Sequence, residues 1–271
     1  MNDQSVKQPY PASAADLNVA HLVQITDCHI FASAEERLYG LDTRQSLTTV
    51  IQAAIGNHHK ADLLLATGDL SQDGKAASYE YLANEIDDLG IPTFWLPGNH
   101  DDNDVLEAHF TGNEIHSSKH LLIGNWQVLL LDSTVRNQVY GQVSTAQLEF
   151  LNQSLKTFPD HHALVCLHHQ AQDSGCEWLD MKGLKNSAQL RDQLALHENV
   201  RAVLWGHVHQ EFTQVLDNVL WMSTPSSCAQ FKPASKEFAL GCEAPGYRIL
   251  SLYANGHIET SVHRVEQDKI T

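Results

Sequence analysis

The stretch FWLPGNHDDND, at residues 94–104, joins a short apolar run directly to a series of polar side chains. Its first three residues are typical of a buried strand, and the Pro-Gly pair that follows ends the run. The next four residues offer an amide, an imidazole and two carboxylates, which are groups that bind metal ions or transfer protons. By itself, Asn99 after a glycine is typical of a turn. The rest of the chain decides whether this segment is a turn or one wall of a site.

The same arrangement, an apolar run that stops at a polar cluster, occurs in four other segments. They are HLVQITDCHI (21–30), ADLLLATGDL (61–70), HALVCLHHQ (162–170) and RAVLWGHVHQ (201–210). Short apolar runs bounded by turn signals predict buried strands. These five segments are therefore expected to be buried strands, each with a polar cluster at its carboxyl end.

Amphipathic helices are predicted between these strands. Apolar residues at helical spacing follow a predicted N-cap at Asp42, recur in residues 79–86, and follow a predicted capping box of Ser144 and Gln147. Alternating strands and helices predict βαβ units and an α/β fold. From about residue 200 onward, consecutive short strands with antiparallel pairing are predicted at 211–216, 219–223, 247–253 and 257–264.

The composition excludes several functional classes. Asp and Glu outnumber Lys and Arg by 33 to 17, which gives a net charge of −16. Such a chain lacks the basic surface that nucleic acid or an anionic membrane requires. Cysteines without a C-x-x-C pair favour a reducing compartment, and no apolar run suits a membrane span or a signal peptide. We therefore expect a cytoplasmic protein, with a single domain at residues 21–271 and a flexible tail at residues 1–20.

The polar clusters are expected to lie together, because ligands of parallel α/β sheets bind at the carboxyl ends of the strands. Asp27 and His29 are two residues apart, as are His207 and His209, and side chains so spaced in extended backbone point the same way. Carboxylates, an amide and imidazoles form a mixed oxygen and nitrogen set, which favours Fe, Mn, Zn or Co. This set has more ligands than one tetrahedral ion can bind, and it suits two ions bridged by Asp69.

The ordered set D-x-H, G-D, G-N-H-D, H-H and G-H-x-H resembles the metal motifs of the calcineurin-like metallophosphoesterases. Within that superfamily, the chain is most similar to the bacterial class III 3′,5′-cyclic-nucleotide phosphodiesterases. Four segments carry this similarity: GDLSQDGKAASYEYL (68–82), GCEWLDMKGLKN (175–186), TPSSCAQFKP (224–233) and APGYR (244–248). The resemblance implies an α/β fold, a four-layer α/β/β/α sandwich of mixed sheets, with a dinuclear metal centre at the sheet edge.

The resemblance also implies a role for each matching residue. Two ligand sets share one carboxylate: Asp27, His29, Asp69 and His209 for one ion, and Asp69, Asn99, His168 and His207 for the other. The family pattern selects His168 over His169, a choice that strand alternation does not make. Cys28 inside D-x-H and Gln170 after the histidine pair, where the family often has proline, depart from the pattern without changing the ligand count.

His100 and Asp101 are the predicted catalytic residues. His100 follows a metal ligand directly, so it is expected to contact the phosphate or to transfer a proton. Asp101 is expected to orient His100. Asp102 is instead expected to cap the helix that follows, as is Asp104. The expected substrate contacts are Asn99, His100 and His209.

The predicted function is hydrolysis of 3′,5′-cyclic AMP to 5′-AMP with two transition-metal ions, Fe and Mn before Zn or Co. The alternatives are the same centre acting on a 2′,3′-cyclic nucleotide, a glycerophosphodiester or a phosphomonoester, or a non-catalytic scaffold of the same fold. A scaffold predicts missing ligands, whereas every ligand position is filled. The expected partners are a small anionic nucleotide and, at most, a second copy of the chain. Trp178 and Tyr247 either line a nucleotide pocket or pack in the core.

Overall fold

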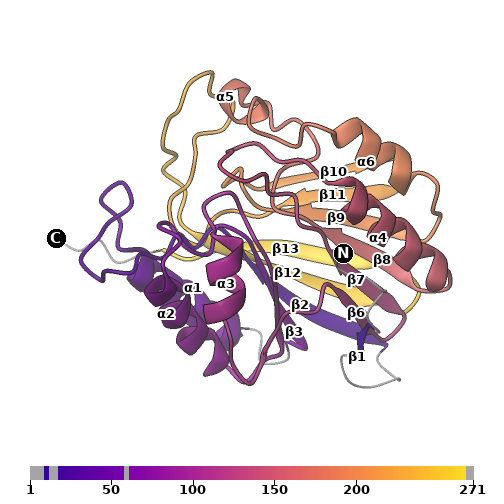
Figure 1. Ribbon diagram of the computed structural model, residues 1–271, viewed down its shortest axis with the longest axis horizontal. Helices are drawn as coiled ribbons and strands as arrows, with labels where there is room; N and C mark the ends of the chain where they lie inside the picture. Colours follow the sequence, from indigo (N-terminus) through magenta and orange to yellow (C-terminus); the bar gives the residue numbers. More distant parts are fainter. Residues whose placement is uncertain (1–8, 12–17, 58–60, 267–271) are drawn as a thin grey trace.

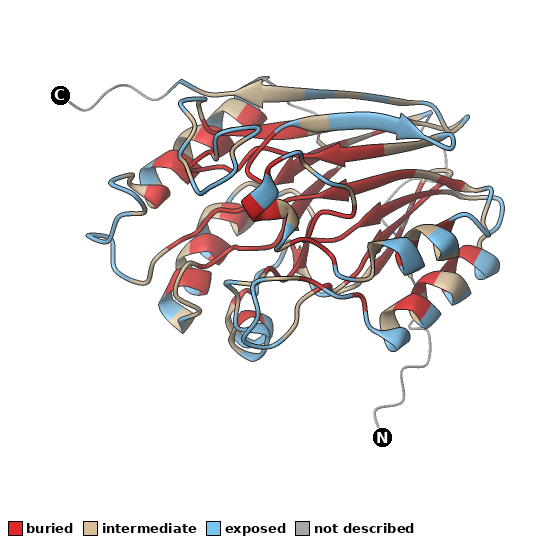
Figure 2. Cartoon of the chain, turned by 90° about the horizontal axis from the view of Figure 1, so that it is seen from above, coloured by how far each residue is buried: buried red, intermediate tan, exposed pale blue. Residues whose placement is uncertain are grey.

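Two β-sheets lie face to face in the middle of the molecule, and helices cover the outer side of each sheet (Figure 1). The computed structural model describes residues 9–11, 18–57 and 61–266. Figure 2 shows that the strands are largely buried, whereas the helices are buried on one side and exposed on the other. The layers follow the order helix, sheet, sheet, helix, so the four-layer α/β fold expected from the sequence is confirmed.

One sheet has six strands. Their order is β13 (Ile258–Arg264), β12 (Gly246–Tyr253), β2 (Val19–Ile25), β3 (Leu63–Thr67), β4 (Thr93–Leu96) and β5 (Ile115–His116). The strands β2 to β5 are parallel to their neighbours, and β12 pairs antiparallel with both β2 and β13. This mixture matches the predicted change from βαβ units to antiparallel strands near the C-terminal end.

The other sheet has seven strands. Their order is β1 (Tyr10–Pro11), β6 (His120–Ile123), β7 (Trp126–Leu130), β8 (His162–Cys166), β9 (Val200–Trp205), β11 (Val219–Ser223) and β10 (Phe212–Leu216). The strands β7, β8, β9 and β11 are parallel neighbours, whereas β6–β7 and β10–β11 pair antiparallel. The β6–β7 pair was not among the predicted strands, although Gly124 and Asn125 separate two apolar runs there, a spacing that is typical of a hairpin.

The apolar strands are explained by burial on both faces. Leu63 and Leu65 of β3 belong to the buried cluster between the two sheets, whereas Leu64 belongs to the cluster beneath the helices. Leu164 and Val165 of β8 divide in the same way. Because successive side chains of a strand point to opposite faces, a strand covered on both sides needs an unbroken apolar run.

Three helices cover each sheet. The six-stranded sheet is covered by α1 (Thr43–Asn57), α2 (Ala76–Asp87) and α3 (Asn103–His109), and the seven-stranded sheet by α4 (Thr145–Thr157), α5 (Glu177–Asp180) and α6 (Ser187–Leu194). The predicted caps of α1, α3 and α4 are confirmed, because Asp42, Asp102 and Ser144 each accept a backbone N–H hydrogen bond from the first turn. The reciprocal half of the Ser144 capping box is absent, since the Gln147 side chain bonds the backbone N–H of Asp132.

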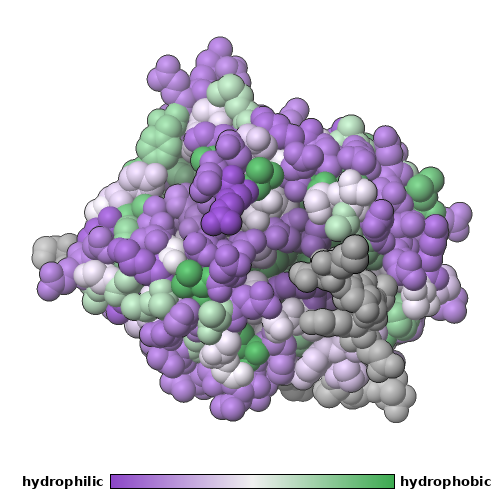
Figure 3. All heavy atoms as spheres, viewed as in Figure 1, coloured by the Kyte–Doolittle hydropathy of each residue, from purple (hydrophilic) through white to green (hydrophobic). Residues whose placement is uncertain are grey.

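The predicted tail at residues 1–20 lies mostly outside the described residues. Its described parts are Tyr10–Pro11, which pair with β6, and the first residues of β2. Within the described ranges, no helix combines the length and the hydrophobicity needed to cross a bilayer. The face shown in Figure 3 is mainly hydrophilic, with hydrophobic side chains in small separate groups.

Candidate metal centre

The loops that follow β2, β3, β4, β8 and β9 carry all the predicted metal-binding side chains. Hydrogen bonds donated by backbone amides join these loops, both within one sheet and from one sheet to the other. The Asp27 amide bonds the Gly68 carbonyl at 2.9 Å, and the His207 amide bonds both carboxylate oxygens of Asp27 at 3.1 and 3.0 Å. The site therefore lies where the ends of strands from both sheets meet.

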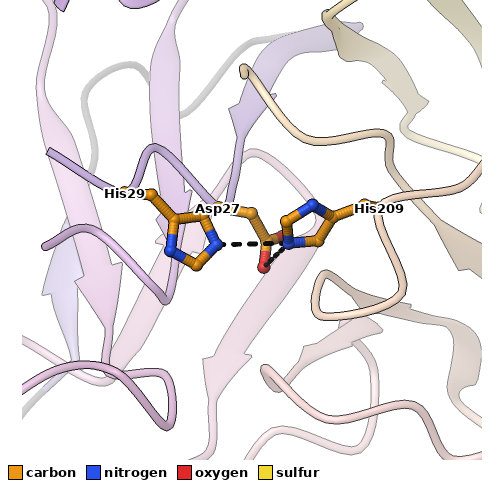
Figure 4. A group of neighbouring side chains, drawn as sticks. All are labelled: Asp27, His29 and His209. Carbon is orange, nitrogen blue, oxygen red and sulfur yellow. Dashed lines mark hydrogen bonds and ion pairs between the residues drawn. The ribbon is translucent and has the colours of Figure 1, made fainter. Parts of the chain in front are cut away.

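One group of potential ligands consists of Asp27, His29 and His209. The Nε2 atom of His209 lies 3.2 Å from Oδ1 of Asp27 and 3.2 Å from Nε2 of His29. Figure 4 shows the three side chains pointing toward one another. All three are buried, and each offers an atom within 4.8 Å of the other two. Two imidazole nitrogens that face each other beside a carboxylate form a suitable donor set for a cation.

A second group consists of Asp69, His168 and His207, which are also buried. Oδ2 of Asp69 lies 3.3 Å from Nε2 of His168 and 3.8 Å from Nε2 of His29. The Asp69 carboxylate therefore lies between the two groups. This is the position that a bridging ligand requires, because such a carboxylate must reach both ions.

Several buried polar atoms at the site have no hydrogen-bond partner. They are Oδ1 of Asn99, Nδ1 of His29, Nε2 of His168 and both ring nitrogens of His207. An unsatisfied buried polar group costs about 1–3 kcal/mol, so such a concentration in one place calls for a ligand. A neutral imidazole has a lone pair on one of its two ring nitrogens, so each of these side chains can offer one donor atom with the chemistry of a transition-metal ligand. The residues present therefore fit a metal centre.

Two histidines are oriented from behind by backbone carbonyls. Nδ1 of His168 donates to the Thr67 carbonyl at 2.9 Å, and Nδ1 of His209 donates to the Ala229 carbonyl at 2.7 Å. Each bond fixes the tautomer and leaves Nε2 free to face the site, as is usual for metal-binding histidines. These two carbonyls could not be predicted from the sequence, because a backbone atom carries no residue-type signal.

The contacts distinguish His168 from His169, which the strand pattern could not do. Nδ1 of His169 lies 2.8 Å from the Ser133 hydroxyl, and its Nε2 lies 3.2 Å from the Val139 carbonyl. Both ring nitrogens of His169 are therefore engaged away from the centre. Only His168 presents a free ring nitrogen to Asp69, which favours the choice that the family pattern makes.

The backbone conformation at the site differs from the extended one predicted for the paired ligands. The D-x-H and H-x-H pairs are not in extended backbone, because β2 ends at Ile25 and β9 ends at Trp205. Positive φ angles occur at Asp27 (53°), His29 (48°), Asp69 (49°), His207 (67°) and His209 (49°). Such left-handed conformations cost about 1–3 kcal/mol each for residues other than glycine, and they gather at functional sites. The paired side chains converge because the loop turns, and not because a strand alternates.

Glycines that precede the ligands allow the loops to approach closely. A Cβ atom on Gly206 would overlap the Thr26 hydroxyl and lie 2.6 Å from Oδ2 of Asp27. A Cβ atom on Gly98 would overlap the backbone amide and the carboxylate of Asp69. The glycine in each of the G-H-x-H and G-N-H-D motifs therefore leaves room for a carboxylate of the neighbouring loop.

His100 lies at the exposed side of the site. Its backbone amide donates to Oδ1 of Asp69 at 2.8 Å, and its ring meets the ring of His29 edge to face at 5.0 Å between centroids. Unlike the buried histidines of the two groups, His100 is exposed. Its imidazole is therefore within reach of a molecule that enters from solvent.

Asp101 has a different position from the one predicted. Its carboxylate accepts hydrogen bonds from the backbone amides of Gly98, Ser71 and Leu70, at 2.8, 2.9 and 3.2 Å, and from the Tyr79 hydroxyl at 3.1 Å. None of these donors is His100, so the predicted orienting contact is wrong. The carboxylate instead joins the loops after β3 and β4, because their backbone amides need an acceptor where no strand supplies one.

A family model for the calcineurin-like phosphoesterases matches residues 20–211 of this chain. The chain belongs to this family. The 3′,5′-cyclic adenosine monophosphate phosphodiesterase CpdA of Escherichia coli is 41% identical, and the match covers 90% of this chain and 89% of that protein. A 3′,5′-cyclic-nucleotide phosphodiesterase of Nostoc is 39% identical, and the match covers 90% of this chain and 92% of that protein.

Solved structures of the same fold have little sequence in common with this phosphoesterase. A dimetal phosphatase from Danio rerio has a TM-score of 0.63 at 14% identity and covers 91% of this chain and 99% of its own. A purple acid phosphatase from yellow lupin has a TM-score of 0.69 at 15% identity, and the match covers 94% of this chain and 52% of the phosphatase. These similarities support the fold alone.

Membership of the phosphoesterase family implies divalent metal ions, and the histidine and aspartate groups are able to hold them.

Burial and charge set the protonation of this phosphoesterase site. Burial lowers the pKa of His29 to about 3 and that of His207 well below its usual range, so both rings are neutral, as metal ligands must be. Burial also opposes the charged form of Asp69, but the adjacent His168 ring outweighs it and holds the Asp69 pKa well below its usual value. His168 in turn has its pKa raised to about 10, because Asp69 and Asp27 outweigh burial. A metal ion that binds there therefore competes with a proton.

The two aromatic residues with open roles both pack in the interior of the phosphoesterase. Tyr247 is fully buried, and its hydroxyl donates to the Ala53 carbonyl of α1 at 3.3 Å. Trp178 is 8% exposed and meets the rings of Phe231 and Phe238 edge to face, at 5.0 and 5.3 Å between centroids. Neither ring is free to line a nucleotide pocket, so the packing interpretation is favoured for both.

Proposed function

We propose that the chain hydrolyses 3′,5′-cyclic AMP to 5′-AMP at this metal centre. The observation that carries the proposal is that two buried groups of potential ligands, Asp27, His29 and His209 in one and Asp69, His168 and His207 in the other, lie where strand ends of both sheets meet. The relatives named as 3′,5′-cyclic-nucleotide phosphodiesterases, at 41% and 39% identity, support the choice of substrate. Those matches cover 90% of this chain and 89% and 92% of the two relatives, so the similarity extends well beyond the metal motifs.

The proposed ligands form two sets that share one carboxylate. They are Asp27, His29, Asp69 and His209 for one ion, and Asp69, Asn99, His168 and His207 for the other. A mixed oxygen and nitrogen set favours Fe or Mn among the ions expected. When bound, two such ions would supply hydroxide at neutral pH and would offset the negative charge of the phosphate in the transition state.

The protein's own groups have distinct tasks in this proposal. The hydrogen bonds that His168 and His209 donate to backbone carbonyls keep both imidazoles directed at the centre, so that little reorganisation is needed during the reaction. The backbone amide of His100 fixes the Asp69 carboxylate. The exposed imidazole of His100 donates a proton to the O3′ atom as its bond to phosphorus breaks, since an alkoxide is a poor leaving group.

The products of a substrate panel test the proposal. With Mn²⁺ present, we expect cyclic AMP to open only at the 3′ bond and to give 5′-AMP, and we expect slower reaction with 2′,3′-cyclic AMP. Chromatographic analysis of cyclic AMP, cyclic GMP and the two 2′,3′ isomers distinguishes the outcomes. Mainly 3′-AMP would mean that the nucleotide binds in the opposite direction, and a preference for a 2′,3′ isomer or a phosphomonoester would assign the centre to another substrate.

A further inference from the structure

Two half-exposed aromatic rings lie in loops that also carry or contact the proposed ligands. Tyr39 is 53% exposed and Phe238 is 49% exposed. Tyr39 lies between β2 and α1, and Phe238 lies between β11 and β12. Although they are far apart in sequence, their ring centroids are 5.4 Å apart, with an angle of 40° between the planes. Large aromatic surfaces left open to water next to a site are typical of ligand contacts.

A chain of ring contacts connects this pair to the proposed ligands. The ring of Phe231 stacks on the ring of His209, with 4.1 Å between centroids and 13° between planes. Phe231 in turn meets Phe238 edge to face at 5.7 Å. Trp178 supports both phenylalanines from the interior, at 5.0 and 5.3 Å. Phe238 is thus two ring contacts from His209, and Tyr39 is one contact further.

Backbone hydrogen bonds close both segments that carry these rings. The segment with Phe238 is closed by hydrogen bonds from the Lys232 amide to the Ala239 carbonyl and from the Gly241 amide to the Gln230 carbonyl, each 2.9 Å. Tyr39, with a φ of 51°, sits at the tip of a turn that backbone hydrogen bonds close between the residues on either side. Rings fixed before a ligand arrives lose little conformational entropy when it binds.

We propose that Tyr39 and Phe238 form a stacking platform for the base of the nucleotide. This inference rests on the proposed function, because it assigns specificity residues to that same centre. The base and the phosphate of a cyclic nucleotide are one ribose apart, and two ring contacts, with centroid separations of 4.1 and 5.7 Å, connect His209 to Phe238. Every base has a π face, and the fused rings of a purine offer a larger one than the single ring of a pyrimidine. The platform therefore favours purines over pyrimidines.

The test compares cyclic AMP with the ribose 3′,5′-cyclic phosphate that lacks a base. For wild-type protein, the ratio of the two kcat/KM values measures how much the base contributes. We expect Tyr39→Ala and Phe238→Ala each to lower this ratio by about tenfold, which is within the range for loss of one base–aromatic stack. Most of the change should appear in KM, because stacking holds the substrate equally before and during the reaction.

Matched variants separate a stack from general packing. Tyr39→Phe keeps the ring and is expected to keep the ratio. Leu240→Ala removes an exposed apolar side chain of the same segment, 44% exposed, and should also keep it. Phe238→Leu keeps an apolar group without a π face and should lower the ratio as alanine does. Because Tyr39 and Phe238 are half exposed, their variants are expected to fold, which thermal unfolding checks.

An unchanged ratio in an active Tyr39→Ala, Phe238→Ala double variant would overturn the platform and leave the proposed function intact. An unchanged ratio together with a changed molecular mass by light scattering would assign the two rings to contact with a second copy of the chain. Wild-type protein that hydrolyses neither cyclic phosphate would overturn the proposed function itself, and the platform with it.

Discussion

Changing Asp69 to alanine is expected to cost the protein both metal ions and to lower turnover of cyclic AMP by more than about 10³-fold. The reason is the position of its carboxylate, 3.8 Å from Nε2 of His29 in one group and 3.3 Å from Nε2 of His168 in the other. Asp69 belongs to two potential metal-binding groups, one with His168 and His207 and one with His29 and His100, and no other carboxylate of the described residues belongs to more than one. Metal analysis after gel filtration, in parallel with turnover, measures both effects.

Asn99→Ala is the matched control for the bridging role. Asn99 belongs to one of the two proposed ligand sets, so its loss should weaken chiefly one ion and leave the other bound. The two variants are therefore expected to differ in the number of metal equivalents retained per chain. An Asp69→Ala protein that keeps both ions tightly would contradict the bridging assignment.

Changing His100 to alanine is expected to keep both metal ions and to lower turnover of cyclic AMP by about 10²–10⁴-fold, the usual contribution of general acid catalysis. His100 is exposed beside His29 and takes no part in the proposed ligand sets. The loss should be much smaller with bis(4-nitrophenyl) phosphate, because a nitrophenolate leaves readily without a proton. Steady-state rates on the two substrates, with metal content measured on the same samples, provide the comparison.

The pattern of losses separates three roles for His100. Equal losses on both substrates would indicate that the ring holds the phosphate or stabilises its charge, and would contradict proton donation. Loss of metal would make His100 a ligand or a support of the site, which the grouping of His29, Asp69 and His100 within 4.8 Å also permits. Only a loss selective for cyclic AMP, with metal retained, agrees with the proposed acid.

A strand that is buried on both faces needs an unbroken apolar run, and in this chain a polar cluster ends each such run. The sequence therefore predicted the strands that lead to the metal centre. It missed β1, β5, β6 and β7, which carry none of the proposed ligands. The strands β1 and β5 have two residues each, which is too short for a periodic pattern. The pairing of the two sheets came from the family resemblance, since a local pattern does not reveal which strands share a sheet.

The candidate site was predictable in composition but not in geometry. The motifs identify Asp27 and His29 as a pair, yet the positive φ angles that make them converge cannot be read from residue types. Asp101 looked like a partner of His100 because the two are adjacent in sequence. Its actual hydrogen-bond donors come from loops after two different strands, and only the folded chain brings them together.

The aromatic platform had no sequence signal for the same reason. Tyr39 and Phe238 are separated by most of the chain and belong to no motif that carries the chemistry. Their relation depends on Phe231, which packs on His209 from the loop between β11 and β12. Trp178, an aromatic residue that the sequence did single out, lies beneath this surface and not on it.

Metal content of the active wild-type protein tests the central claim most directly. If the gathered side chains hold two ions for catalysis, elemental analysis should approach two transition-metal equivalents per chain. Removing them with a strong chelator should abolish hydrolysis of cyclic AMP, and adding Mn²⁺ or Fe²⁺ should restore it. Full activity in a protein shown to be free of metal would contradict the account.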